Sequence, residues 1–297
     1  MERRAEHLGV GAAIISSTLG GIALGVTRIV IGATDPITLG ALRYAGGVIF
    51  LLPVTLAVSA RWPRRADWLA VALLGLLFFG IFPVIYNAAL LFTIAGRGAL
   101  ALSTLPLLTM LVGAVLGIER LTARKTWGVL LAMGGVAMAL AAGLAAAPPG
   151  AWRGDAIMVC GALCMALYNV WSRPFIARSS PLAFVTAGMA VGAVCLVALA
   201  AWRGGFQPLA GFAAPQWIAI VYLGLGGAAV NFYLWVLALE RTTPTRVAST
   251  ITVNPLAASI VAALTLGEPI GLPLLAGIAA VAAGLWIAST EAAAARR

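Results

Sequence analysis

Long apolar segments alternate with short polar connectors along almost the whole chain. Each apolar segment is close to the roughly 20 residues that an α-helix needs to cross the hydrocarbon core of a bilayer. This pattern predicts an all-α integral membrane protein with ten transmembrane helices. We expect these spans at Leu8–Ile31, Ile37–Ser59, Trp68–Phe92, Gly98–Gly117, Trp127–Ala146, Asp155–Ser172, Leu182–Trp202, Trp217–Leu239, Val247–Leu266 and Leu272–Ser289.

The pattern also repeats within the chain. Leu90–Gly135 aligns with Leu239–Gly284 without a gap, at a constant offset of 149 residues, and Pro106 then aligns with Pro255. An internal repeat of this length in an apolar chain is typical of transporters built from two related halves. A stiff turn at Pro148-Pro149-Gly150 separates the halves. We therefore expect a first five-helix repeat at residues 8–146, a linker at residues 147–154 and a second five-helix repeat at residues 155–289.

Composition supports the membrane assignment. Hydrophobic residues make up 62% of the chain and charged residues 9%, with a mean hydropathy of +1.05, whereas about a quarter of the residues of a soluble protein are charged. The predicted spans leave no room for a soluble domain. The net charge of +10 does not indicate a nucleic-acid partner, because the arginines occur singly or in pairs between apolar segments rather than in one patch.

The arginines and the lysine indicate the orientation in the membrane. With the N-terminus in the cytoplasm, fourteen of them fall in cytoplasmic segments and four, including Arg97, in external connectors. Positive charge is retained on the cytoplasmic side, so both termini are predicted to be cytoplasmic. Because each half has five spans, the connectors after Glu119 and Glu268 then face opposite sides. The repeats are therefore predicted to be inverted around a central cavity, the arrangement that underlies alternating access.

Polar and aromatic side chains in the middle of spans are the candidates for substrate binding. An asparagine in hydrocarbon must find hydrogen-bond partners, so each is expected to face the interior of the bundle. Tyrosine and tryptophan also form belts at the membrane surfaces, which is the alternative for these residues. A cavity with aromatic walls and a few amides would suit an uncharged or zwitterionic organic solute. The candidates are Tyr86, Asn87, Tyr168, Asn169, Asn231 and Trp235.

Pro106 and Pro255 lie within the fourth and ninth predicted spans, at equivalent positions of the repeat. A proline there removes a backbone hydrogen bond and bends the helix. Freed backbone groups at membrane depth are tolerated where they face protein or a watery cavity. We expect the two prolines to be hinges or kinks beside the cavity, with Ser103 and Asn254 as further binding candidates. A purely structural kink is the alternative.

Arg43 is the only charged residue well inside a predicted span, where a charge costs at least about 2.5 kcal/mol unless it is compensated. It could contact a substrate carboxylate, or it could tie helices together through backbone carbonyls. Of these two roles we favour the structural one.

The residues that are missing from the spans limit the mechanism. No Asp or Glu lies in the middle of a predicted span, and the single histidine, His7, is in the N-terminal segment. Proton-coupled carriers usually keep such a group as a relay, so we expect uniport or exchange, with sodium coordination by backbone carbonyls left open. For the same reason we expect no catalytic residues, no metal site and no cofactor, and we do not expect the protein to be an enzyme.

The two halves resemble a known family. Each has a proline-containing fourth span that ends in a Gly-x-Glu motif, Gly117-Ile118-Glu119, or in its shifted version, Gly267-Glu268-Pro269. These features, Arg43 in the second span and the glycine-rich fifth and tenth spans are similar to the ten-helix EamA-type exporters of the drug/metabolite transporter superfamily. The resemblance covers essentially the whole chain. It implies a cavity lined by the first four helices of each half, and it looks closest to the bacterial aromatic amino acid exporters of the inner membrane.

We therefore expect a carrier that exports aromatic and other neutral amino acids or related metabolites across the lipid bilayer by alternating access. One alternative is an exporter of another small organic metabolite or drug. The other is a membrane protein that does not transport, such as a helical scaffold or a subunit of a lipid-modifying complex. The inverted repeat with paired prolines favours a carrier, because a scaffold has no need of two kinks related by a pseudo-two-fold axis.

Overall fold

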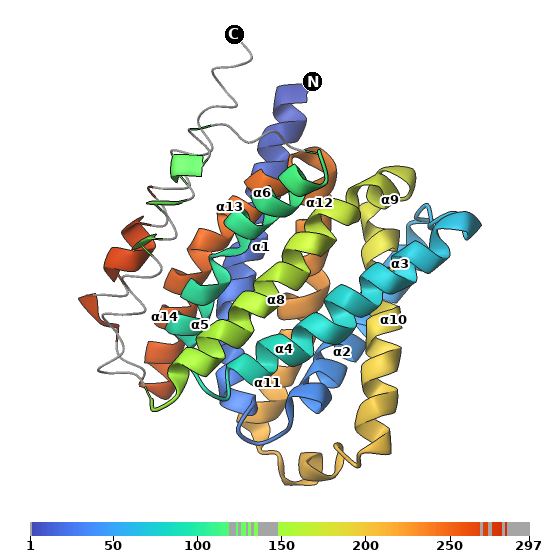
Figure 1. Cartoon of the computed structure of the whole chain (residues 1–297). Helices are drawn as coiled ribbons and strands as arrows, with labels where there is room; N and C mark the ends of the chain where they lie inside the picture. Colours follow the sequence, from blue (N-terminus) through green and yellow to red (C-terminus); the bar gives the residue numbers. More distant parts are fainter. Residues whose placement is uncertain are drawn as a thin grey trace.

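The computed structural model describes residues 2–118 and 148–267, together with scattered positions of 123–135 and 270–283. The regular secondary structure of these residues is helical, and the helices form a bundle (Figure 1). Eight helical stretches among them are long and apolar enough to cross a membrane, which confirms the first four and the sixth to ninth predicted spans. The predicted fifth and tenth spans lie mostly, and Glu119 and Glu268 entirely, outside the described residues.

Most spans consist of more than one helical segment. The first half contains α1 (Glu2–Val30), α2 (Pro36–Ala57), α3 (Trp68–Gly75), α4 (Phe82–Ala89), α5 (Ala95–Leu102) and α6 (Leu105–Val115). The second half contains α8 (Ala151–Trp171), α9 (Arg173–Arg178), α10 (Pro181–Trp202), α11 (Ala214–Gly224), α12 (Asn231–Arg241), α13 (Pro244–Ser249) and α14 (Asn254–Leu266). Short 3₁₀ turns lie at Arg65–Asp67, Gln207–Gly211 and Thr250–Val253. The start of α8 falls inside the predicted linker.

The second and seventh spans start with the same local sequence device. The carboxylate of Asp35 accepts hydrogen bonds from the backbone N–H groups of Ile37 and Thr38, at 3.0 and 3.2 Å, at the start of α2. The hydroxyl of Ser180 accepts one from the N–H of Ala183, at 3.3 Å, at the start of α10. In both cases a proline follows the capping residue, where its missing N–H would have no intrahelical partner anyway. The cap and the proline together determine where each helix begins.

The 149-residue repeat is also present in the backbone. Leu76–Ile81 and Leu225–Val230 are both π-helical and lie at equivalent positions of the two halves. They join α3 to α4 and α11 to α12, respectively. A π-helical turn shifts the backbone hydrogen bonds to the i→i+5 pattern and often occurs at functional sites. The halves therefore share an irregularity that the sequence pattern did not predict.

The fourth and ninth spans are interrupted directly before their prolines. α5 ends at Leu102 and α6 begins at Leu105, and the 3₁₀ turn Thr250–Val253 separates α13 from α14. Pro106 and Pro255 are each the second residue of the helix that follows, a position where the absent N–H removes no intrahelical bond. The prolines therefore begin a new helix rather than removing a hydrogen bond within one, and a kink or hinge role stays a prediction.

The two halves exchange their first helices. α1 packs against α11, α12 and α14 of the second half, and α8 packs against α4, α5 and α6 of the first (Figure 1). Gly21 allows α1 to lie close to α14: a Cβ atom at this position would be 2.7 Å from the carbonyl oxygen of Asn254 and 2.8 Å from the Cβ of Ala257. One turn later, Gly25 faces Val261 in the same way. Small residues thus bring the helices of different halves into backbone contact.

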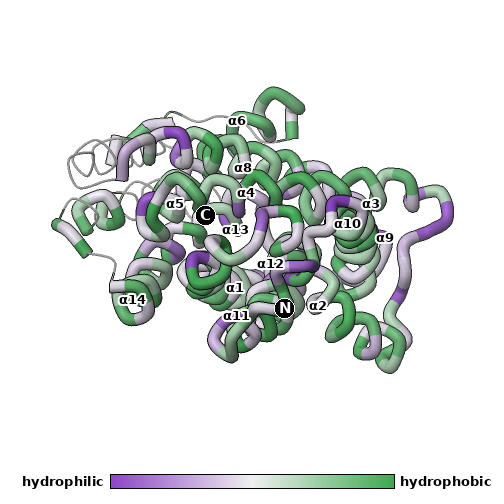
Figure 2. Tube along the Cα trace, turned by 90° about the horizontal axis from the view of Figure 1, so that it is seen from below, coloured by the Kyte–Doolittle hydropathy of each residue, from purple (hydrophilic) through white to green (hydrophobic). Residues whose placement is uncertain are grey.

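Large apolar side chains cover the outside of the bundle. Leu69, Val115, Trp202 and Leu264 are each more than 70% exposed. Figure 2 shows hydrophobic residues along most of the helices, with the hydrophilic residues gathered in short stretches. Extensive exposed apolar surface is unfavourable in water and is expected of a protein whose helices face lipid.

We expect Gly21→Ala to lower the thermal stability of the detergent-solubilised protein, because the added methyl group must push α1 away from α14. Overpacking of this kind costs about 1–3 kcal/mol. Gly11→Ala is the matched control in the same helix, since no atom lies within 4 Å of a Cβ built there. Thermal unfolding curves check the prediction, and equal melting temperatures for the two variants would contradict it.

Candidate functional site

A small cavity lies between the two halves of the bundle. The space open to the centre of a water molecule measures about 30 Å³. This is room for a few water molecules, whereas sites for organic ligands usually measure about 300–1,000 Å³. The cavity is therefore too small for an organic solute in this structure. Its polar and aromatic lining includes Ser16, Ser17, Arg43, Tyr86, Asn231, Trp235 and Asn254.

The structure brings together five residues that the sequence analysis singled out. The residues that line the cavity are Arg43, Tyr86, Asn231, Trp235 and Asn254. Asn169 does not line the cavity itself, but its Oδ1 accepts a hydrogen bond of 2.9 Å from Nε1 of Trp235, which does. This bond holds the buried indole ring by its polar edge, as tryptophan in a protein interior requires.

Three other predicted residues do not line the cavity. Asn87 Nδ2 donates a hydrogen bond of 3.0 Å to the carbonyl of Pro36, at the start of α2. Tyr168 stacks on Phe78 with ring centroids 4.1 Å apart, inside a cluster of aromatic rings. The hydroxyl of Ser103 donates to a carbonyl one turn earlier in its own helix, at 3.1 Å. In this structure Asn87 and Ser103 bond to backbone carbonyls, and Tyr168 packs among aromatic rings in the interior of the bundle.

Ser16 and Ser17 of α1 also line the cavity, although neither was predicted from the sequence. The hydroxyl of Ser16 donates a hydrogen bond of 2.6 Å to Oδ1 of Asn231. The hydroxyls of Ser17 and Thr250 lie 2.7 Å apart. The two serines thus connect α1 to α12 and to the interruption before α14. Two adjacent hydroxyl groups in the middle of the apolar first span were the available signal.

Arg43 is buried, with 5% of its surface exposed. Its Nη2 donates a hydrogen bond of 2.6 Å to the carbonyl of Gly227, in the second π-helical segment. Its guanidinium carbon lies 5.7 and 5.9 Å from the ring centroids of Tyr86 and Phe232, within the range of a cation–π interaction. The carbonyl of Gly227 also accepts a hydrogen bond of 3.1 Å from Asn231 Nδ2. The π-helical segment therefore provides an acceptor for two polar side chains of the cavity.

Two ion pairs join the halves at equivalent positions of the repeat. Arg97 Nη2 lies 2.5 Å from Asp155 Oδ2, and Arg246 pairs with Glu6. Arg246 follows Arg97, and Asp155 follows Glu6, by the same 149 residues. We call these contacts the Asp155 pair and the Glu6 pair. Each joins the first span of one half to the fourth span of the other, and since α1 begins at the top of Figure 1 and α8 at the bottom, they lie at opposite ends.

The expected position of Arg97 in an external connector is wrong. Arg97 is the third residue of α5 and is 6% exposed. A cation in the first turn of a helix is electrostatically unfavourable, and Asp155 compensates for this charge. The hydroxyl of Thr93 donates a second hydrogen bond to Asp155, at 2.9 Å. Because its charge is neutralised, Arg97 can be enclosed by the protein.

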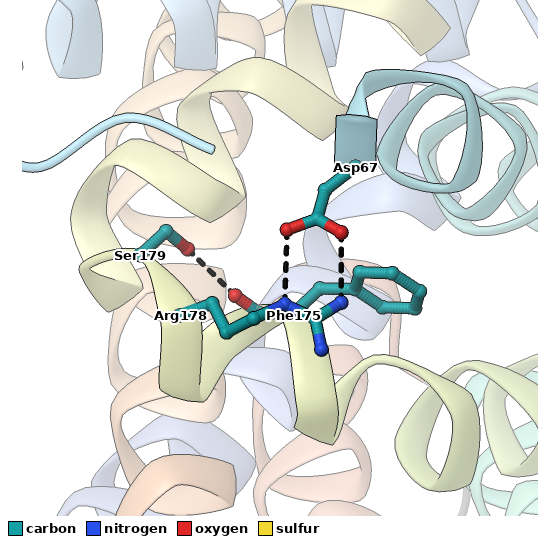
Figure 3. Close-up of polar contacts among 4 residues, drawn as sticks. All are labelled: Asp67, Phe175, Arg178 and Ser179. Carbon is teal, nitrogen blue, oxygen red and sulfur yellow. Dashed lines mark hydrogen bonds and ion pairs between the residues drawn. The ribbon is translucent and has the colours of Figure 1, made fainter. Parts of the chain in front are cut away.

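The ion pair between Arg178 and Asp67 lies at the end of the bundle where α1 begins. Arg178 donates two hydrogen bonds to Asp67, at 3.0 Å from Nε and 2.8 Å from Nη2, and its guanidinium lies over the ring of Phe175 (Figure 3). The contact ties the connector before α3 to α9. In the second half, the residue equivalent to Asp67 by the 149-residue offset is Gln216. This contact is therefore a difference between the halves.

The geometry agrees with comparisons to known proteins. The sequence profile of the EamA-like transporter family matches residues 7–141 and 152–290. The chain is 30% identical over 239 residues to a probable terminal-alkyne amino-acid exporter of Streptantibioticus cattleyicolor, with 77% of each chain covered. It is 28% identical over 222 residues to the aromatic amino acid exporter YddG of Ancylobacter novellus, with 71% of this chain and 72% of that protein covered.

The fold is also found in a solved protein. A crystal structure matches with a TM-score of 0.73 at 22% identity, covering 99% of both chains, so the arrangement of helices is shared along the full length. The two profile matches together span most of the sequence, one in each half. The chain is a multi-pass membrane transporter, and it belongs to the EamA-like transporter family of the drug/metabolite transporter superfamily.

Proposed function

We propose that this transporter exports neutral amino acids, aromatic ones among them, or closely related metabolites, by alternating access as a uniporter or exchanger. The lining of the cavity supports this substrate class, because Tyr86 and Trp235 offer aromatic walls and Asn231 and Asn254 offer amides. Two of the relatives are named as amino-acid exporters. Membership of a transporter family decides against the scaffold alternative.

The Asp155 pair and the Glu6 pair are the observation that carries the mechanism. In an inverted repeat the two ends of the bundle can exchange their geometries, so that one end opens as the other closes. A pair of corresponding residues at each end would hold that end closed and would separate when it opens. The two ion pairs occupy the positions that such an exchange requires.

The two pairs differ in burial. The side chains of Arg97 and Asp155 are 7% and 10% exposed, and those of Arg246 and Glu6 are 23% and 30% exposed. Removing one partner of a buried pair costs about 3–5 kcal/mol, whereas a solvent-exposed pair contributes about 0.2–1 kcal/mol. We therefore expect the Asp155 end to be the more strongly closed.

We place the protein in the bacterial inner membrane with both termini in the cytoplasm, as the distribution of arginines predicts. The Glu6 pair then closes the cytoplasmic end and the Asp155 pair closes the external end. A substrate leaving the cell enters the cavity past the weaker pair and leaves it past the stronger one.

Purified protein in liposomes is expected to move labelled tryptophan, phenylalanine, threonine or methionine faster than empty liposomes do. Trp235→Ala should lower the initial rate at least about tenfold, because it removes a cavity wall and leaves Asn169 without its donor. Trp202→Ala is the control, since Trp202 is 84% exposed at the end of α10. Rates no higher than those of empty liposomes for all four amino acids would refute the amino-acid proposal.

The same liposomes test the coupling. An imposed proton gradient is expected to leave the initial rate unchanged, because no carboxylate or histidine lies among the described residues that line the cavity. The measurement compares rates with and without the gradient at zero membrane potential. A strong dependence on the gradient would overturn uniport and exchange, and would leave the substrate assignment intact.

Asp155→Asn and Glu6→Gln are expected to open opposite ends. A cysteine at Ser17, in a variant without the three native cysteines, reports access to the cavity by its reaction rate with a membrane-impermeant maleimide. Asp155→Asn should raise the rate from the external side at least about tenfold. Glu6→Gln should raise it from the cytoplasmic side less than about tenfold, because that pair is more exposed.

Glu240→Gln is the matched control for these two variants. Glu240 pairs at 3.7 Å with its neighbour Arg241 on the same helix, so this pair does not join the halves. The control should leave both labelling rates unchanged. If Asp155→Asn and Glu6→Gln changed access from the same side, the two pairs would not be the two ends of one alternating mechanism.

A further inference from the structure

Arg43 carries a buried charge that no carboxylate in the described part of the chain balances. The ion pairs of the described residues involve the other arginines named above, and none involves Arg43. Its Nε is buried without a hydrogen-bond partner, although Nη2 is bonded to Gly227. A buried charge without a counter-ion is strongly unfavourable. The position is explained if an anion enters the cavity that Arg43 lines.

The fold does not require a cation at this position. α2 and α10 are helices of 22 residues that both begin with a proline, and Arg43 and Gly188 are the eighth residue of each. At the 149-residue offset the residue equivalent to Arg43 is Gly192, so a glycine stands at the equivalent place in either alignment. Gly188 packs on the backbone of Gly75, whose Cβ, if present, would lie 2.5 Å from the carbonyl oxygen of Gly188. The second half thus fills the equivalent place by close packing of backbone. Arg43 is a feature of the cavity rather than of the repeat.

The same cavity holds an unpartnered acceptor. Oδ1 of Asn254 is buried without a hydrogen-bond partner, and the residue is 2% exposed. The side-chain amides of Asn254 and Asn231 both lie beside Gly20. A Cβ atom at Gly20 would be 3.5 Å from Asn254 Nδ2 and 3.7 Å from Asn231 Nδ2. Glycine leaves open the space onto which the two amides converge. The cavity therefore presents a cationic donor and a neutral acceptor, both short of partners.

We infer that Arg43 binds the carboxylate of the transported solute and that Asn254 Oδ1 accepts a hydrogen bond from its ammonium group. The transported species is then an α-amino acid zwitterion, and neither an amine nor a neutral amide carries the full set of matching groups. A hydrogen bond between guanidinium and carboxylate is charge-assisted and stronger than one between neutral groups. The aromatic residues Tyr86, Phe232 and Trp235 face the solute's side chain. This inference rests on the proposed function.

Competition for labelled phenylalanine in liposomes tests the inference. Unlabelled phenylalanine should compete at least about tenfold better than its primary amide, which has the same ring and ammonium group and no carboxylate. Arg43→Gln should abolish this preference, and Arg43→Lys should keep the preference with weaker binding, because lysine keeps the charge and loses the planar fork.

Arg28→Gln is the matched control. Arg28 also donates a hydrogen bond to a backbone carbonyl, that of Leu90 at 2.7 Å, and it does not line the cavity. This variant should keep the wild-type preference. If wild type accepts the acid and the amide equally, or if Arg43→Gln keeps the preference, Arg43 has only a structural role and the inference is overturned. If Arg43→Gln does not fold, the wild-type comparison and Arg43→Lys decide.

A binding measurement separates this inference from the proposed function. Phenylpropionate should raise the melting temperature of the detergent-solubilised wild type, and phenylpropionamide should not. The rise should be absent in Arg43→Gln and present in Arg28→Gln. If no amino acid is transported but this pattern is found, the proposed function fails and the carboxylate site stands. If transport occurs and neither compound discriminates by its carboxylate, the function stands and the inference fails.

Discussion

The structure depends on one requirement, that every backbone N–H and C=O group inside the bilayer has a partner within the protein. Regular helices meet it by themselves, so departures from regular helix occur only where other groups supply the missing partners. The second π-helical segment is such a place, because the carbonyl of Gly227 accepts hydrogen bonds from Arg43 and Asn231. The 3₁₀ turn before Pro255 is another, where the hydroxyl of Thr250 lies 2.7 Å from that of Ser17 and donates a hydrogen bond of 2.8 Å to the carbonyl of Val247. Polar side chains at and beside the cavity therefore stabilise the irregular backbone at these two places.

The repeat and its exceptions have different physical roles. The π-helical segments and the two inter-half ion pairs follow the 149-residue offset, and under the proposed mechanism the ion pairs set how one half moves on the other. Arg43 and Gly188 break the equivalence at the cavity. A solute such as an amino acid has no two-fold axis, so the residues that bind it gain nothing from symmetry. Arg43 is thus an asymmetric feature at the cavity, and the Asp67–Arg178 contact is another at the end of the bundle where α1 begins.

Much of the architecture was predictable because hydrophobicity dominates in a membrane. The described spans and the repeat followed from apolar segments and an ungapped alignment, and Tyr86, Asn231, Trp235 and Asn254 meet as expected. Asn87, the neighbour of Tyr86, does not line the cavity because successive residues of a helix point about 100° apart. The burial of Arg97 was not predictable, since it depends on Asp155 from the other half. The π-helical segments depend on contacts between helices and have no distinct signal in the sequence.

The small volume of the cavity has a consequence for how affinity is measured. A site with room for a few water molecules must widen before it holds an organic solute, so the conformation seen here is not the one that binds. The apparent dissociation constant then equals the intrinsic constant divided by the fraction of molecules in the widened form. Under the proposed mechanism, the Asp155 pair and the Glu6 pair set this fraction, although both lie at the ends of the bundle. Half-saturation concentrations then report on the stability of the closed ends as well as on the fit of the ligand.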